Sequence, residues 1–281
     1  MLPESPLRIA LLIDADNAPA DKLDEILTEL STLGVINIRR AYGNWTKPAL
    51  HGWQSRLLEF ALRPMQQFDY SKRKNATDMA MTVDAMELLY TERPDAFGIV
   101  SSDADFTPLV MHLRAKGAAV YGFGAQQTPL PFVNACSRFL YLEALGQGVA
   151  DGAAVEAPAE EGPAPAPAAG PAPAPTPAPV ERGDVQAPPC PVSLRVPSQQ
   201  LRQDSQLLAL LRDAVNATQD EQGWARVGSV GTQIGNKASF DARNYGYATL
   251  TKLLAATQAF DMRDEGTSRV AVRDKRLLRA P

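Results

Sequence analysis

Short apolar runs alternate with amphipathic stretches over the first half of the 281-residue chain. The apolar runs predict strands at residues 7–13, 35–41, 66–70, 96–101 and 119–123. Apolar residues at helical spacing predict helices at residues 19–33, 49–62, 77–90, 106–116 and 131–137. Strands that alternate with helices form parallel sheets, so we predict a three-layer α/β domain. In the helix at 77–90, we expect the buried face to consist of Met79, Val83, Met86 and Tyr90.

An Ala- and Pro-dominated segment, from Asp151 to about Pro197, divides the chain. Such a composition buries no core and favours extended conformations, so we predict a disordered linker at 149–198. The linker would join a domain at 1–148 to a smaller one at 199–281. In the smaller domain, helices at 201–217, 227–234 and 248–256 and a hairpin within 259–272 predict a winged-helix-like module.

Composition excludes several classes of protein. No run of 18 apolar residues is present, and acidic residues flank the first apolar segment, unlike a signal peptide. We therefore expect a cytoplasmic protein without a membrane partner. Cys136 and Cys190 are too few and too far apart for a disulfide framework or a zinc knuckle.

Nucleotide cofactors are not expected either. Residues 122–124 (Gly-Phe-Gly) lack the later glycine of a dinucleotide-binding fingerprint, and the chain has no P-loop. Residues 201–281 carry 12 Lys and Arg against 9 Asp and Glu, which is compatible with a polyanionic partner. The sequence does not indicate whether the protein forms a homo-oligomer, so that partner is left open.

Two predicted strands end in the same acidic pattern. Asp14 and Asp16 follow the first strand, and Asp103 and Asp105 follow the fourth. The carboxyl ends of parallel strands lie at one edge of a sheet, so these carboxylates can converge. Converging carboxylates with no His or Cys nearby favour Mg²⁺ or Mn²⁺, ions that pair with phosphate oxygens. The alternative for each acid is a charge or cap at a helix start.

Other residues near the same edge extend this pattern. Asp78, at the start of the helix at 77–90, is a third candidate ligand, whereas Asp84 lies about 240° further round the helix and is expected to be supporting. Asn17 either orients a phosphate or water or caps the following helix. Lys72, Arg73 and Lys74 precede Asp78 and are candidate contacts to a nucleic-acid backbone, with a solvated loop as the alternative.

These motifs resemble the NYN domain, a branch of the PIN-like nucleases. The resemblance covers residues 7–145 and rests on residues 13–17 (IDADN), 74–84 (KNATDMAMTVD) and 101–106 (SSDADF). It implies a Rossmann-like fold in which Asp14, Asp78 and Asp103 bind Mg²⁺ or Mn²⁺, with Asp105 as a further ligand and Asn17 assisting. It also implies in-line attack of water on an RNA phosphodiester.

Residues 201–274 resemble the OST-HTH or LOTUS domain, an RNA-binding module of winged-helix type. The resemblance rests on residues 224–234 and on residues 244–247 (NYGY) with the leucines that follow. The RNA-contact candidates are Arg243, Tyr245, Tyr247 and Lys252. For the tyrosines, packing between helices is an equal alternative.

Taken together, the acidic pattern and the two resemblances predict a metal-dependent ribonuclease that acts on single-stranded or structured RNA. Endonucleolytic cleavage is favoured, whereas exonucleolytic cleavage and a DNA substrate are left open by the sequence. A noncatalytic RNA-binding adaptor is the main alternative, because an acidic site does not prove turnover. A phosphatase of the haloacid-dehalogenase type also begins with Asp-x-Asp after its first strand. That class expects Thr or Val where this chain has Asn17, which makes it the weaker alternative.

Overall fold

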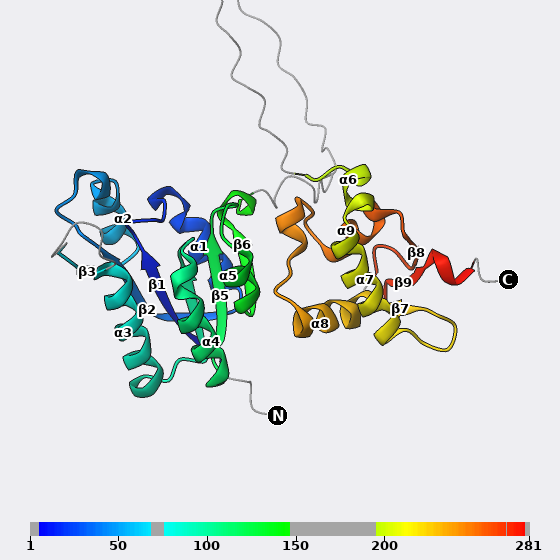
Figure 1. Cartoon of the computed structure of the whole chain (residues 1–281), viewed down its shortest axis with the longest axis horizontal. Coiled ribbons are helices and arrows are strands. Elements are labelled where there is room, and N and C mark those ends of the chain that lie inside the picture. Colours follow the sequence, from blue (N-terminus) through cyan, green and yellow to red (C-terminus); the bar gives the residue numbers. More distant parts are fainter. Residues whose placement is uncertain (1–5, 69–75, 147–194, 268, 279–281) are drawn as a thin grey trace, which may run out of the picture. The chain divides into compact units, whose positions relative to one another are not determined.

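The structure, a computed structural model, describes residues 6–68, 76–146, 195–267 and 269–278. The first two of these segments contain one six-stranded sheet (Figure 1). Its strands are β1 (Leu7–Asp14), β2 (Gly34–Gly43), β3 (Arg63–Gln66), β4 (Ala96–Val100), β5 (Ala119–Gly124) and β6 (Arg138–Tyr141). The order is β3-β2-β1-β4-β5-β6, and every neighbouring pair is parallel. The predicted α/β fold with a parallel sheet is therefore confirmed.

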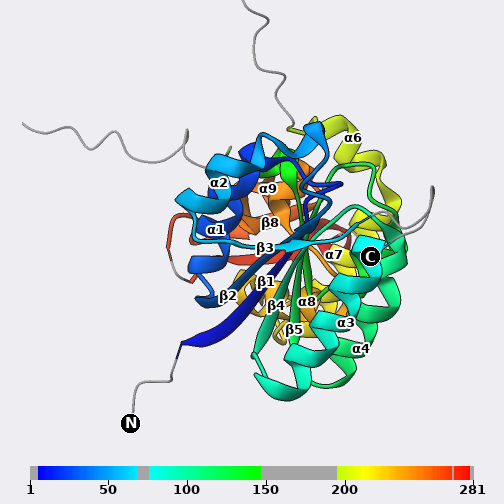
Figure 2. The same cartoon turned by 90° about the vertical axis from the view of Figure 1, so that its left-hand side faces the viewer.

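Helices cover both faces of this sheet (Figure 2). One face carries α1 (Leu23–Ser31) and α2 (Trp53–Glu59), and the other carries α3 (Ala76–Thr91), α4 (Thr107–Ala115) and α5 (Leu130–Ala135). The central strand β1 supplies both cores, because Ile9, Leu11 and Ile13 pack on one side and Ala10 and Leu12 on the other. A strand that is buried on both faces has an unbroken apolar sequence, as observed here.

Two strands differ from the prediction. The third strand was placed at 66–70, whereas β3 ends at Gln66. The strand was missed because Arg63 and Pro64 interrupt the apolar pattern that is typical of a strand. Pro is tolerated at this position because β3 lies at the edge of the sheet. The last strand, β6, was not predicted, since its four residues follow directly on α5 without a glycine or proline boundary.

The buried face of α3 was predicted wrongly for three of its four residues, whereas the fourth, Met86, is partly buried against the core. Met79, Val83 and Tyr90 are 66%, 63% and 51% exposed. The residues that pack against the sheet are instead Met81, Ala85, Leu88 and Leu89. Apolar residues occur all around this helix, so periodicity alone does not determine which face turns inward.

The C-terminal residues form a separate helical core with a small sheet. The helices are α6 (Ser198–Gln203), α7 (Ser205–Thr218), α8 (Val227–Lys237) and α9 (Leu250–Thr257). Strands β7 (Ala225–Arg226), β8 (Phe260–Arg263) and β9 (Ala271–Asp274) form an antiparallel sheet in the order β7-β9-β8. These four helices and the β8–β9 hairpin agree with the predicted winged-helix-like module, for which three helices were expected.

The helix predicted at 201–217 is in fact two helices. Asp204 lies between α6 and α7, and its carboxylate accepts a hydrogen bond from the backbone N–H of Leu207 at 2.9 Å. An aspartate in this position satisfies one of the unpaired N–H groups of a helix start, which favours a new helix at Ser205. Leu201 on α6 and Leu207 and Leu211 on α7 are buried in the same core, so apolar residues continue across the break.

The predicted linker lies almost wholly outside the described residues, as does Cys190, whereas Cys136 is a buried free thiol. None of the helices that the structure describes is long and apolar enough to cross a lipid bilayer.

Candidate functional site

Asp14, the last residue of β1, has a fully buried side chain. Its Oδ2 atom accepts hydrogen bonds from Asn17 Nδ2 at 2.8 Å and from Ser101 Oγ at 3.0 Å. Its Oδ1 atom is buried without a hydrogen-bond partner among the described residues. Burial raises the pKa of this carboxyl, because the charged form loses hydration. The site therefore contains an oriented carboxylate with one oxygen left for another ligand.

Asn17 does not cap the following helix. The N-cap position of the 3-10 helix Ala20–Lys22 is Pro19, and no side chain bonds to that helix start. The amide of Asn17 instead fixes the rotamer of Asp14. Of the two roles predicted for Asn17, the helix cap is excluded by this geometry.

The chain that leaves β4 lies beside Asp14. Ser101 links the two strand ends, because its hydroxyl donates to Asp14 and accepts the backbone N–H of Asp103 at 3.1 Å. Asp103 in turn caps the 3-10 helix Ala104–Phe106, with its Oδ1 atom accepting the N–H of Asp105 at 2.8 Å. Asp103 is thus a helix cap through one oxygen. Ser101 was not among the predicted site residues, and its bridging role depends on a contact between strands that are far apart in the sequence.

Asp78 lies in the first turn of α3, and the other acids of the predicted site influence its ionisation. Its pKa is raised to about 6, first by desolvation and then by Asp14, Asp103, Asp105 and Asp16. Like charges raise a carboxyl pKa only when they are near. The structure therefore brings the four predicted ligands and Asp16 into one electrostatic group at the carboxyl end of the sheet.

Asp16 is held by two side chains of the protein. Its oxygens pair with Lys47 Nζ at 3.2 Å and with Thr77 Oγ1 at 2.9 Å. Lys47 was not predicted to belong to this region. The signal that could have identified it is its position just after the second strand, at the same edge of the sheet as Asp14.

Asp84 does not face the acidic group. Arg40 and Tyr42, both on β2, donate hydrogen bonds to its two oxygens. Burial, followed by the bond to Asp84, raises the pKa of the Tyr42 hydroxyl. Asp84 therefore ties α3 to the sheet, which agrees with the supporting role predicted for it.

The donor set fits a hard divalent cation. The clustered side chains are carboxylates, and the unpartnered Oδ1 of Asp14 is the kind of buried oxygen that a cation would satisfy. In the described part of the chain, however, no three His, Cys, Asp or Glu side chains lie at distances that enclose a metal ion. The carboxylates are close enough to shift a pKa without being at coordinating distance.

The predicted RNA contacts have different surroundings. Lys72, Arg73 and Lys74 lie outside the described residues. Arg243 donates to both carboxylate oxygens of Glu29, at 2.6 and 2.8 Å, and also pairs with Asp241. These bonds lower the pKa of Glu29 and raise that of Arg243. The guanidinium of Arg243 is thus committed to carboxylates of the protein.

The aromatic candidates are largely packed inside the C-terminal core. Tyr247 is 3% exposed, and its hydroxyl donates to the Val196 carbonyl at 2.9 Å. Tyr245 packs against Phe240, and burial raises its pKa to about 12. Lys252 is exposed on α9. This placement favours the packing alternative for Tyr247 and leaves Lys252 the most accessible of the four.

Comparisons with known proteins identify both halves of the chain. The model of the NYN domain matches residues 8–143, and that of the OST-HTH/LOTUS domain matches residues 201–272. The uncharacterized protein MJ0482 of Methanocaldococcus jannaschii is 33% identical over 123 residues, which are 42% of this chain and 48% of the relative. The chain thus spans about half the length of the curated relative that it matches.

A solved structure also resembles part of the chain. It is a protein of unknown function, VPA0982, from Vibrio parahaemolyticus RIMD 2210633. The identity is 19% and the TM-score 0.41, and the match covers 50% of this chain and 96% of the other. A likeness of this degree carries no argument about function.

Proposed function

Residues 8–143 form an NYN domain and residues 201–272 an OST-HTH/LOTUS domain, and on that premise we propose that the chain is a metal-dependent endoribonuclease. The observation that carries the proposal is the group of acids around Asp78, with the buried, unpartnered Oδ1 of Asp14 beside it. Carboxylates held together against their repulsion are typical of sites that bind a cation and a phosphate.

In this proposal Asp14, Asp78, Asp103 and Asp105 hold Mg²⁺ or Mn²⁺, which when bound supplies positive charge at the scissile phosphate and activates water. The other residues position these ligands. Asn17 and Ser101 orient Asp14, and Ser101 also couples the position of Asp103 to it. The Asp103 cap on residues 104–106 keeps Asp105 at the end of β4.

The test is cleavage of a labelled single-stranded RNA, and of a DNA of the same sequence, by the full chain with Mn²⁺, Mg²⁺ or EDTA. We expect cuts within the RNA with metal and none with EDTA. Asp14→Asn and Asp103→Asn should each lower the cleavage rate at least about a hundredfold while RNA binding persists, because each loses a charge that faces the phosphate. Asp21→Asn, at an exposed acid outside the group, is the matched control and should cleave normally.

The adaptor alternative makes a different prediction in the same assay. It predicts that RNA is bound but never cut, and that Asp14→Asn and Asp103→Asn change neither property. Cleavage that survives in EDTA, or in both variants, would contradict the proposed site. Cleavage of the DNA at the same rate would contradict the assignment as a ribonuclease.

A further inference from the structure

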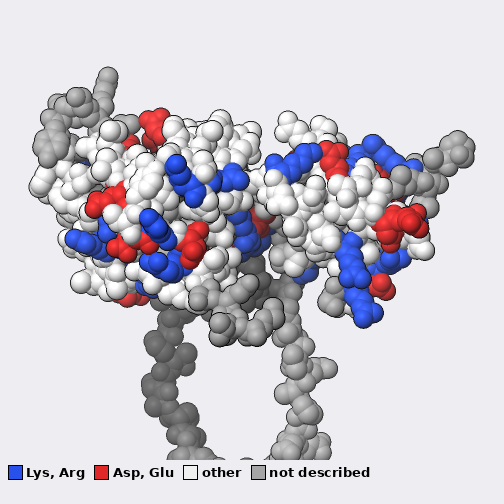
Figure 3. Space-filling view, turned by 90° about the horizontal axis from the view of Figure 1, so that it is seen from below, with Lys and Arg blue, Asp and Glu red and all other residues white. Residues whose placement is uncertain are grey.

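The face of the molecule in Figure 3 does not present a surface of one charge. Basic and acidic side chains are interspersed there over the described residues. Among the predicted RNA contacts of the C-terminal domain, Arg243 is paired with carboxylates and Tyr247 is buried. A concave surface that includes arginines without a carboxylate partner is therefore the better candidate for anion binding by this domain.

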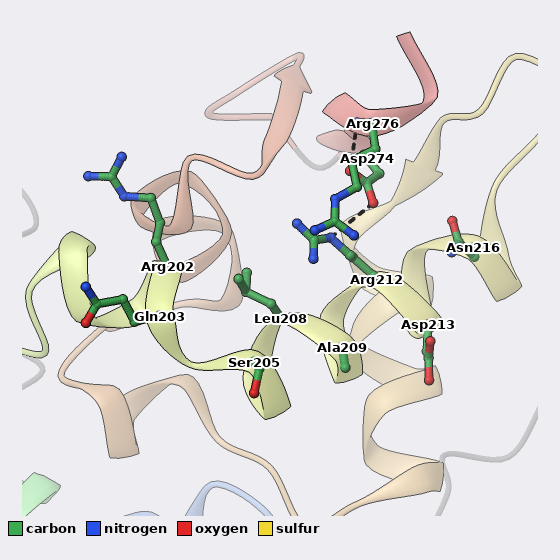
Figure 4. A pocket seen from close by; sticks show the side chains of 10 residues that line it. All are labelled: Arg202, Gln203, Ser205, Leu208, Ala209, Arg212, Asp213, Asn216, Asp274 and Arg276. Atoms are coloured by element: carbon green, nitrogen blue, oxygen red, sulfur yellow. Dashed lines mark hydrogen bonds and ion pairs between the residues drawn. The ribbon is translucent and has the colours of Figure 1, made fainter. Parts of the chain in front are cut away.

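Such a surface exists between α6, α7 and the end of β9 (Figure 4). It is an open pocket of 610 Å³. Three arginines from different elements line it: Arg202 on α6, Arg212 on α7 and Arg276 after β9. Gln203, Ser205 and Asn216 add polar groups to the lining. We call this surface the arginine pocket.

Asp274 organises one end of the arginine pocket. Its side chain is 6% exposed, and its Oδ2 atom lies 3.2 Å from Arg212 Nε. Its Oδ1 atom accepts the backbone N–H of Arg276 at 3.0 Å. Figure 4 shows Arg212 and Arg276 near this carboxylate, with Arg202 at the other end of the pocket. The guanidinium of Arg212 is thereby held in place before any ligand binds.

The charges of the pocket do not cancel. Asp274 pairs with Arg212, and the other lining acid, Asp213, pairs with Lys237 at 2.5 Å. Arg202 and Arg276 form no ion pair with a carboxylate of the described residues. Both are exposed, so their guanidinium groups are available to an anion from solution.

We propose that the arginine pocket binds backbone phosphates of RNA. Guanidinium groups match phosphate oxygens with paired N–H donors, and the neutral polar groups can bond to phosphate or to the ribose hydroxyl. An acidic peptide is the less favoured occupant because Gln203, Ser205 and Asn216 place neutral polar groups beside the arginines, as the contacts to a sugar–phosphate backbone require. The inference rests on the proposed function, since it assigns the RNA contact to this surface.

The experiment measures the affinity of the full chain for a fluorescent single-stranded RNA over a series of salt concentrations. EDTA is present so that the RNA is not cut. The test variant is the double substitution Arg202→Gln and Arg276→Gln. Its matched control is Arg226→Gln and Arg269→Gln, which removes the same charge from exposed positions outside the pocket. Thermal unfolding of each variant checks that the fold is kept.

We expect the pocket variant to bind RNA at least about tenfold more weakly at low salt, and the control variant to change affinity less than about threefold. Each lost phosphate contact should reduce the slope of log affinity against log salt by about 0.7, so the pocket variant should lose about 1.4. An equal loss in both variants would overturn the inference, because it would show a diffuse charge effect.

Two further outcomes separate this inference from the proposed function. Wild-type protein that cuts RNA, together with a pocket variant that binds RNA normally, would overturn the pocket and leave the nuclease in place. Wild-type protein that does not bind RNA would overturn both. A fluorescent poly-glutamate peptide serves as the second probe, and pocket-dependent binding of this peptide with unchanged RNA affinity would assign the pocket to an acidic protein partner instead.

Discussion

The carboxyl of Asp78 links stability to pH. Its pKa is about 6 in the folded protein, above its ordinary value of 3.8, because of desolvation and four neighbouring acids. The folded state thus holds this proton more tightly than the unfolded state does. Its contribution favours folding at low pH and is lost as the pH rises from about 4 through about 6.

Asp78→Asn should therefore stabilise the protein at pH 7 and have little effect near pH 4. A shift of two pKa units is worth at most about 3 kcal/mol. Since the side chain is only partly buried, we expect about 1 kcal/mol in the free energy of unfolding. Urea unfolding in EDTA at the two pH values measures this, with the exposed Asp21→Asn as control. The same gain at both pH values would contradict the electrostatic explanation.

Gly124, which ends β5, approaches the site closely. A Cβ atom there would lie 2.7 Å from the Ser101 carbonyl oxygen and 2.6 Å from Thr128 Oγ1. Gly124→Ala should therefore displace Ser101, lower the free energy of unfolding by about 1–3 kcal/mol and reduce cleavage. Gly52→Ala, where a Cβ would meet nothing within 4 Å, should leave both unchanged. Equal unfolding midpoints and cleavage rates for the two variants would contradict the prediction.

The glycines of residues 122–124 also show the limit of motif matching. The sequence excluded a dinucleotide fingerprint there but offered no reason for the glycines. The structure supplies one, since Cβ atoms at Gly122 and Gly124 would collide with Cys136 and Ser101 respectively. Contacts of this kind join residues far apart in the chain, and a local pattern does not contain them.

At the scale of elements, the strand ends were predictable and the orientation of α3 was not. Apolar runs that end in acids identify β1 and β4 because buried strands need continuous apolar sequence. In α3 the apolar residues surround the helix, so a tertiary contact selects the inner face. Asp84 bonds to Arg40 and Tyr42 on β2, and we expect this contact to contribute to that selection.

Removing this contact should weaken the packing of α3. Asp84→Asn leaves the Arg40 guanidinium, which is 19% exposed, without its counter-charge. We expect a loss of about 3 kcal/mol in the free energy of unfolding, because an unpaired buried charge is costly. Tyr42→Phe removes only one hydrogen bond and should cost about 1 kcal/mol.

The matched control for Asp84→Asn is Glu59→Gln, which breaks the exposed pair with Arg56. Pairs of that kind contribute less than about 1 kcal/mol. Urea unfolding of the three variants measures the differences. If Asp84→Asn costs no more than Glu59→Gln, the contact does not determine the orientation of the helix.

For the whole molecule, the two domains should respond differently to metal. The acids that the proposal assigns as ligands all lie in the NYN domain, whereas the arginine pocket lies in the OST-HTH/LOTUS domain. A cation that neutralises the acid group stabilises the folded NYN domain, because the unfolded chain does not hold those carboxylates together. RNA bound at the pocket would stabilise the other domain.

Thermal unfolding in EDTA and in Mn²⁺ or Mg²⁺ tests this separation. At metal concentrations about a hundred times the dissociation constant, binding adds about 2.7 kcal/mol. The NYN transition should then rise by about 5–10 °C. Asp14→Asn and Asp103→Asn should each reduce that rise, whatever their Tm without metal, and Arg202→Gln with Arg276→Gln should leave it unchanged. A metal-induced rise that is undiminished in both aspartate variants would place the cation elsewhere and remove the basis for the nuclease site.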